Sequence, residues 1–429
     1  MKKFINPPRN NWKKLIARPI ISSQEIKSVL EEIFQTVKKN GDMALKKYTK
    51  KFDQVNLGDI FVKHKEITNS KNLISNRLKE AINIAKLNIE VFHKAQKIKP
   101  INVTTSIGVN CWQEKRPIEK IGLYIPGGTA PLFSTILMLA IPAKIAGCKE
   151  IVLCTPPNRE GKIPPVVLYT ANLCGITKIY KVGGIQAIAA LTFGTETIPR
   201  VYKIFGPGNQ YVTAAKQFAT FHNVAIDMPA GPSELLIAAD DSAIPSYIAS
   251  DLLSQAEHGP DSQVILVTTN LDLIDFVIDE IKKQINLLPR REIMKQAIAN
   301  SRMIYFDSNQ NAVEFINAYA PEHYMICMKN EEYYLREIEN AGSVFIGNYS
   351  PESAGDYASG TNHILPTNGY AKQYSGLNID SFLKQMSFQK ISVKGIKNIG
   401  PAIEVMASAE GLDAHKNAVS LRLNDLKNE

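Results

Sequence analysis

The sequence predicts an α/β protein with two Rossmann-like parallel-sheet domains, an N-terminal arm and a small helical C-terminal segment. Short apolar runs of strand length alternate with longer runs of helix length from about residue 119 to residue 346, which is typical of βαβ units and a parallel sheet. The chain has 429 residues, which is long for a single domain. Hydrophobic residues make up 45% of it and charged residues 21%, as in an ordinary soluble globular protein.

The expected elements divide the chain into four parts. Residues 1–20 are expected to form the N-terminal arm. Residues 21–123, which read as helices up to about residue 100, combine with residues 235–380 into a discontinuous α/β domain. Residues 124–234 form the second α/β domain, in which KEIVLCT and KIYKV read as strands. Residues 381–429 are expected to be a small helical domain.

Composition excludes several classes of protein. No apolar run reaches the roughly 18 residues that a membrane helix needs, and the basic N-terminus MKKFINPPRNNWKK lacks the apolar core of a signal peptide. The five cysteines form no CxxC pair, and an odd number in a chain of this size indicates a reducing compartment rather than a disulfide scaffold. The sequence therefore predicts a cytoplasmic protein that does not act at a membrane.

The net charge of +9 is unevenly distributed, because residues 1–100 carry 22 Lys and Arg against 9 Asp and Glu. A basic region of this kind can contact nucleic acid. Here the lysines recur at helical spacing among apolar residues, as on a solvated helix face, and no cluster of aromatic residues is interleaved with them. We therefore expect no nucleic-acid partner.

Four dense polar motifs contain four of the seven histidines. They are SQAEHGP (254–260), APEH (320–323), SAGDYASGTNHILPT (353–367) and AEGLDAHKNAV (409–419). Imidazoles and carboxylates at irregular spacing in Gly-rich loops suit a composite metal site, since its ligands converge in space rather than in sequence. The motifs contain no thiol, so the predicted ligands are nitrogen and oxygen, which zinc, manganese or iron can accept. A metal site or an acid–base site is expected.

The SQAEHGP motif closes a helix-like run, and its glycine and proline stop the helix. Gln255 and His258 are three residues apart and share one face of the last turn. Taken alone, the motif reads as a solvated helix end. Two Gly-rich pieces, IPGG (125–128) and FGPGN (205–209), follow predicted strands, where open α/β sheets bind ligands. Neither matches GxGxxG, so phosphate binding and a tight strand–helix turn both remain open.

Long blocks of the sequence closely resemble histidinol dehydrogenase. They are LYIPGGTAPLFST, KIFGPGNQYVTAAK, IDMPAGPSE, SDLLSQAEHGPDSQV, PEH, SPESAGDYASGTNHILPT and AHKNAV. The resemblance runs nearly end to end, with the blocks in the family's order. It implies a zinc-dependent, NAD-linked oxidation of L-histidinol to L-histidine through L-histidinaldehyde, with two NAD consumed, in the last steps of histidine biosynthesis.

The resemblance also implies roles for individual residues. The zinc ligands would be Gln255, His258, Asp356 and His415. His323 would take the hydroxyl proton as hydride leaves, and Glu322 would activate the water that attacks the aldehyde. The other substrate-contacting positions would be Ser233, His363 and Glu410, and the cofactor-contacting positions Tyr124, Gln186 and Asn209.

Two further expectations concern assembly and the competing interpretation. The family forms a homodimer whose C-terminal segment crosses to the partner, so Glu410 and His415 would complete the other subunit's active site. A metal-dependent hydrolase with the same ligands and Glu322 as the base for water remains the alternative, because no nucleotide-binding fingerprint is present.

Overall fold

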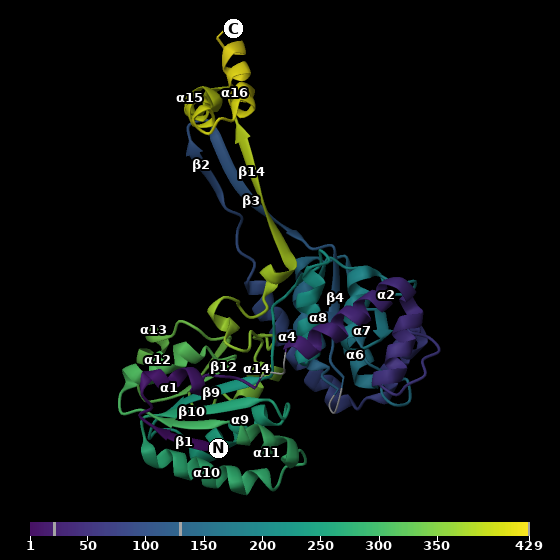
Figure 1. Ribbon diagram of the computed structural model, residues 1–429, viewed down its shortest axis with the longest axis vertical. Coiled ribbons are helices and arrows are strands. Elements are labelled where there is room, and N and C mark those ends of the chain that lie inside the picture. Colours follow the sequence, from purple (N-terminus) through teal and green to yellow (C-terminus); the bar gives the residue numbers. More distant parts are fainter. Residues whose placement is uncertain (20–22, 128–130, 428–429) are drawn as a thin grey trace. The chain divides into compact units, whose positions relative to one another are not determined.

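The computed structural model describes residues 1–19, 23–127 and 131–427 and contains two compact units (Figure 1). The first unit comprises Met1–Gln96 and Glu119–Ser381, and the second comprises Lys97–Ile118 and Phe382–Glu429. Two parallel sheets flanked by helices lie in the first unit, and the chain ends in two helices. The predicted α/β fold class is therefore confirmed.

A five-stranded parallel sheet carries the Gly-rich pieces. Its strands follow the order β6-β5-β4-β7-β8. They are β4 (Lys120–Tyr124), β5 (Glu150–Thr155), β6 (Lys178–Lys181), β7 (Lys203–Phe205) and β8 (Ala225–Ile226). The helices that join them are α5 (Ser134–Ala146), α6 (Pro165–Leu173), α7 (Gly184–Phe193) and α8 (Gln210–Thr220). The strand order reverses between β4 and β7, so the loops that follow these two strands border the crevice in which open sheets bind ligands.

The N-terminal helices belong to this sheet rather than to the other one. They are α2 (Ser23–Phe52), α3 (His64–Asn69) and α4 (Asn76–Ala95), with the short 3-10 turn η1 (Ser70–Leu73). Phe34, Leu45 and Tyr48 of α2 share one apolar core with Ile188 of α7. The expected grouping of residues 21–123 with 235–380 therefore differs from the observed packing, because periodicity reveals the apolar face of a helix but not the sheet that this face covers.

A six-stranded parallel sheet forms the other half of the first unit, in the order β1-β11-β10-β9-β12-β13. Its strands are β1 (Lys2–Ile5), β9 (Glu234–Ala239), β10 (Gln263–Thr268), β11 (Arg302–Tyr305), β12 (His323–Cys327) and β13 (Ser343–Ile346). Its helices are α1 (Arg9–Leu15), α9 (Pro245–Ala256), α10 (Leu271–Ile285), α11 (Arg291–Ala299), α12 (Asn309–Tyr319), α13 (Glu331–Glu337) and α14 (Glu352–Tyr357). Short 3-10 turns follow at η2 (Tyr370–Lys372) and η3 (Ile379–Phe382).

Strand β9 lies at the centre of this half and is buried on both faces. Leu235 and Ile237 pack with α9 and α10, whereas Leu236 and Ala238 pack with α12, because successive side chains of a strand point to opposite faces. This explains why the strand reads as a continuous apolar run rather than an alternating one. The two apolar cores fix β9 and its neighbour β12, so the first residues of both strands are rigidly placed.

The expected N-terminal arm is built into the six-stranded sheet. Strand β1 pairs in parallel with β11, with Lys2 opposite Arg302. The Trp12 ring of α1 makes edge contacts with Phe306 and Phe315, at centroid distances of 5.9 and 5.5 Å. The arm therefore contributes an edge strand and part of the core.

The second unit differs from the helical segment expected at 381–429. Strand β14 (Leu383–Ile391) pairs antiparallel with β3 (Val109–Pro117), which pairs with β2 (Asn102–Ser106), and two helices follow, α15 (Val393–Ala409) and α16 (Asp413–Asp425). Residues 97–118 thus contribute two of the three strands. These strands are largely polar and exposed, so no apolar run marked them in the sequence.

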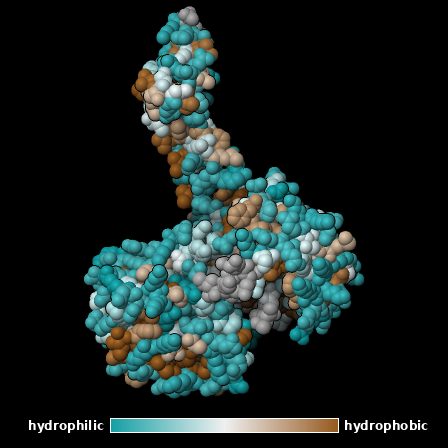
Figure 2. Space-filling view, in the orientation of Figure 1, coloured by the Kyte–Doolittle hydropathy of each residue, from teal (hydrophilic) through white to brown (hydrophobic). Residues whose placement is uncertain are grey.

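Much of the apolar surface of the second unit is exposed, and Figure 2 shows it as brown patches over these elements. Val405 of α15 is 70% exposed and Met406 64%, and α16 has no buried residue. Among the described residues, no helix is both long and apolar enough to cross a membrane.

Candidate active site

A cavity of about 850 Å³ lies in the first unit and is lined by loops of both parallel sheets. This volume is in the range of small-molecule sites. All predicted site residues of the first unit line it: Tyr124, Gln186, Asn209, Ser233, Gln255, His258, Glu322, His323, Asp356 and His363. The structure therefore brings together residues that are up to 239 positions apart in the sequence.

The two sheets present opposite ends to this cavity. The five-stranded sheet contributes the carboxyl end of β4, at Tyr124, and the loop after β7. The six-stranded sheet contributes the amino ends of β9 and β12, where Ser233 and His323 lie. The rule that open sheets bind ligands at carboxyl ends thus holds for the first sheet only.

The backbone of Glu234 orients the Glu322–His323 pair. The Glu234 N–H donates to Oε2 of Glu322 at 2.8 Å, and the Glu234 carbonyl lies 3.1 Å from Nδ1 of His323. A carbonyl can only accept, so Nδ1 carries the hydrogen and Nε2 is left as the atom that can take up a proton. Nε2 is buried and has no hydrogen-bond partner within the described parts of the chain.

Three carboxylates surround the His323 imidazole. Glu322 and Glu352 lie 3.5 and 3.9 Å from Nδ1, and Asp356 lies 3.6 Å from Nε2. Burial opposes protonation of the ring, but these carboxylates outweigh it and raise the pKa of His323 well above its usual value. Burial also raises the pKa of Glu322. The imidazole and the carboxylates therefore stabilise each other's charged forms in a buried place.

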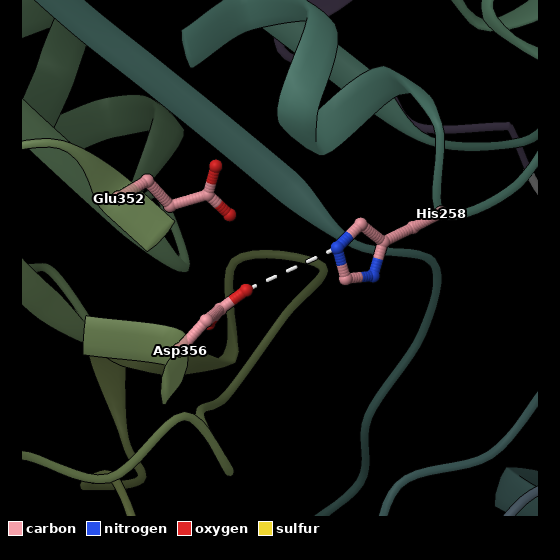
Figure 3. A group of neighbouring side chains, drawn as sticks. All are labelled: His258, Glu352 and Asp356. Carbon is pink, nitrogen blue, oxygen red and sulfur yellow. Dashed lines mark ion pairs between the residues drawn. The ribbon is translucent and has the colours of Figure 1, made fainter. Parts of the chain in front are cut away.

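His258, Glu352 and Asp356 form a cluster that could hold a metal ion, since one ligand atom from each lies within 4.8 Å of the others. Figure 3 shows both carboxylates near the His258 ring, with Nε2 of His258 3.9 Å from Oδ2 of Asp356. The His258 side chain is 39% exposed and reaches the open cavity, while the two acids are buried. Two ligands of one zinc ion at about 2.1 Å each lie roughly 3–4 Å apart, which this pair matches.

The acidity of the two carboxyl groups differs sharply. Burial disfavours ionisation of Asp356, but His323, His363 and His258 outweigh it and lower its pKa to about 2. Burial is the main reason that the pKa of Glu352 rises to about 8, with Asp356 and Glu322 adding to it and His323 opposing it. Asp356 is therefore the permanent anion of the cluster, and Glu352 takes up a proton at neutral pH when no cation is present.

Glu352 is not among the site residues expected from the sequence. It lies four residues before Asp356 on α14, so the two acids share one face of that helix. Oε2 of Glu352 accepts a hydrogen bond from Ser254 at 2.8 Å. With the Gln255 amide turned so that its nitrogen donates to Glu352, its oxygen lies 3.1 Å from the Glu234 nitrogen. The spacing of Glu352 and Asp356 in SPESAGDY was the signal available in the sequence.

His363 lies between the two halves of the cavity. One ring nitrogen, Nδ1, lies 2.9 Å from the backbone oxygen of Asp356, and Nε2 lies 3.2 Å from the Thr135 hydroxyl. Burial lowers the pKa of His363, against the raising effect of Asp356. Because a carbonyl only accepts, Nδ1 of the neutral ring carries the hydrogen, and Nε2 can only accept, from Thr135 or from a polar ligand.

The other end of the cavity is formed by the three cofactor-contacting candidates. The Tyr124 hydroxyl accepts a hydrogen bond from the Gly184 N–H at 3.1 Å, and burial raises the pKa of this tyrosine to about 12. Asn209 caps α8, because its side-chain oxygen accepts from the Val212 N–H at 3.1 Å. Oε1 of Gln186 is buried without a partner in the described residues. A ligand N–H or O–H would satisfy it.

The loop after β7 depends on Gly206. Its N–H donates to Asp227 at 2.8 Å, its carbonyl accepts from Lys216 at 2.8 Å, and Lys216 and Asp227 form a buried ion pair. Gly206 has φ +129°, and a Cβ there would collide with the backbone oxygen of Tyr124. Only glycine fits this position.

Gly206→Ala should lower the free energy of unfolding by about 2 kcal/mol or more, because both the backbone conformation and the contact with Tyr124 are incompatible with a side chain. Urea unfolding measures this change. Gly58→Ala is the matched control, since a Cβ at Gly58 meets no described atom within 4 Å. Equal stability of the two variants would contradict the proposed constraint.

The sequence model of histidinol dehydrogenases matches residues 16–423. The chain belongs to the histidinol dehydrogenase family. Histidinol dehydrogenase of Bacteroides thetaiotaomicron is 54% identical over 427 residues, which cover 100% of both chains. That of Escherichia coli O157:H7 is 50% identical over 420 residues, 97% of this chain and 96% of that protein. The crystal structure of the enzyme from Elizabethkingia anophelis matches with a TM-score of 0.97 and 57% identity, covering 100% of this chain and 99% of that one.

Two predicted site residues of this chain lie in the second unit. Glu410 is the C-cap of α15, and His415 lies in the first turn of α16, where its side chain is exposed. Their part in the active site therefore stays a prediction, whereas the ten other residues share one cavity.

Proposed function

We propose that this protein catalyses the zinc-dependent, NAD-linked oxidation of L-histidinol to L-histidine through L-histidinaldehyde, in the last steps of histidine biosynthesis. The observation that carries the proposal is the single cavity in which an imidazole–carboxylate cluster faces strand-end loops of a doubly wound sheet. Membership of a dehydrogenase family favours this reaction over hydrolysis.

Gln255, His258 and Asp356 would hold the zinc ion, with His415 as the fourth ligand. The fit rests on the donor set of the cluster and on the three carboxylates that surround His323. When bound, zinc would attract the neutral imidazole and amine of histidinol and offset the carboxylate charge that keeps His323 protonated.

His323 would act as the base in the first oxidation. Its Nε2 accepts the hydroxyl proton of histidinol while hydride moves from the carbon to NAD, which yields the aldehyde, NADH and a protonated imidazole. The hydrogen bond from Nδ1 to Glu234 holds the ring in the required tautomer. His323 then releases its proton before the next cycle.

Glu322 would act in the second oxidation. Its carboxylate takes a proton from a water molecule that adds to the aldehyde, and the resulting hydrate loses hydride to a second NAD and a proton to His323, which yields histidine. A buried carboxyl with a raised pKa suits this transfer, because it binds the proton more readily than an exposed one.

The remaining residues would bind and orient the two substrates. Ser233 and His363 line the cavity beside the cluster and would contact histidinol, together with Glu410. Tyr124, Gln186 and Asn209 would contact NAD, and the unpartnered Gln186 oxygen supports a hydrogen-bonding ligand at that end.

We further propose a homodimer in which α15 and α16 complete the partner's site. Exposed apolar side chains such as Val405 and Met406, and the absence of buried residues on α16, favour association of this unit with another chain. The five free cysteines, four of them buried, fit a cytoplasmic location.

Mixing the protein with L-histidinol and NAD should produce NADH, seen as absorbance at 340 nm, with two NADH formed for each histidine. A chelator should abolish the activity and added zinc should restore it, because ligand sets of this type depend on the metal. Release of a hydrolysis product without NADH would instead support the hydrolase alternative.

A further inference from the structure

Arg18 of the N-terminal segment lies in a buried ion pair next to the catalytic residues. Its Nε and one Nη donate to the two carboxylate oxygens of Glu234 at 3.0 and 2.9 Å. The side chains of Arg18 and Glu234 are 7% and 1% exposed. Glu234 is the residue whose backbone N–H and carbonyl bond Glu322 and His323. Glu234 therefore bonds Arg18 through its side chain and both proposed catalytic residues through its backbone.

Arg18 also holds the segment that precedes Glu322. It donates to the Tyr319 carbonyl at 2.7 Å, and its guanidinium lies 3.6 Å from the centre of the Tyr319 ring. The next residue, Ala320, has φ +54°, a left-handed conformation that costs free energy for a non-glycine residue. The two contacts of Arg18 with Tyr319 stabilise the turn that precedes Glu322.

A third segment meets the same ion pair. The Asn368 N–H donates to Oε1 of Glu234 at 2.6 Å, and the neighbouring Thr367 hydroxyl accepts from the Gly231 N–H. Thr367 lines the cavity and lies four residues after His363, which lines it too. Arg18 and Glu234 thus connect the start of β9, the turn before β12 and this loop.

We propose that Arg18 is a positioning residue for the Glu322–His323 pair and acts through Glu234. The inference rests on the proposed function of that pair. Two nitrogens of the planar Arg18 guanidinium donate to Glu234 and the third to the Ile16 carbonyl, so the plane sets the direction of the Glu234 carboxylate and with it the peptide units on either side. A buried ion pair stabilises a fold no better than well-packed apolar side chains, so stability alone does not require these charges.

Two variants test the role. Arg18→Lys keeps the charge but cannot form the planar fork. The double variant Arg18→Met/Glu234→Gln removes both charges, so neither partner is left buried and unpaired. Both should lower kcat by about 10–100-fold, the usual loss when a residue that orients an active group is replaced. KM for histidinol and NAD should stay unchanged, because Arg18 bonds none of the residues proposed to contact them. Zinc bound per chain is measured alongside, since the Gln255 oxygen lies near the Glu234 nitrogen.

Arg9→Gln is the matched control, because Arg9 belongs to the same segment and pairs with Glu314 at the surface, where its side chain is 67% exposed. Its kcat should equal that of the wild type. A wild-type kcat in the double variant would show that Arg18 only balances a charge and would overturn the proposal. A fall in kcat of Arg18→Lys that is fully explained by a lower fraction of folded protein or of bound zinc would also overturn the proposal. A wild-type protein that forms no NADH from histidinol would refute the proposed function instead.

Discussion

Replacement of His323 by asparagine should lower kcat for histidinol oxidation by about 10²–10⁴-fold, the usual cost of removing a general base. The asparagine amide can still donate to the Glu234 carbonyl, so the start of β12 should keep its place. KM for NAD should therefore change little. Steady-state NADH formation measures both constants, and a kcat near the wild-type value would exclude His323 as the base.

Glu322→Gln is the companion variant, because glutamine keeps the acceptor for the Glu234 N–H but cannot take a proton. It should impair oxidation of added histidinaldehyde more than conversion of histidinol to the aldehyde. Single-turnover measurements with each substrate separate the two steps. Equal losses in both steps would contradict the division of work between Glu322 and His323.

The other large effect concerns the proposed metal ligands. If the proposed zinc site is right, the His258→Ala and His415→Asn variants should each lose bound zinc and nearly all activity, because each lacks one ligand. Metal analysis of the purified variants measures the first loss and the NADH assay the second. Full zinc content and full activity in either variant would refute the ligand set.

A dimer of one His258→Ala chain and one His415→Asn chain distinguishes a crossed tail from an uncrossed one. If His415 serves the partner, one site lacks two ligands and the other has all four, so about half of the activity per dimer returns if the sites act independently. If the tail serves its own chain, each site lacks one ligand and nothing returns. Co-purification with two different tags isolates the mixed dimer, and an inactive mixed dimer excludes the crossed arrangement.

Much of the first unit was predictable from the sequence. The strands are apolar runs bounded by Gly-rich turns. The motif SQAEHGP marks the C-terminal end of α9, and APEH marks the start of β12. These features are local, so periodicity and turn residues reveal them. Ten site residues could be named by resemblance, and they share one cavity.

Contacts between distant segments were not predictable in the same way. The packing of α2 on the five-stranded sheet and the pairing of β3 with β14 depend on which surfaces meet, and amphipathic patterns do not specify a partner. Glu352 was missed although its spacing of four residues from Asp356 places both acids on one face of α14. The Arg18–Glu234 pair joins residues 216 positions apart, and single residues give no signal of such a contact.

The pairing of β1 with β11 sets the order in which a growing chain can complete its fold. Lys2 has no strand partner until Arg302 has left the ribosome, so a segment synthesised early is among the last to find its place. During that interval the exposed Lys2 and Lys3 disfavour pairing of this strand with another nascent chain. Arg18 follows β1 in the same segment and can bond Glu234 only once this segment is in place. The newly made chain should therefore gain activity only after translation has passed well beyond β11.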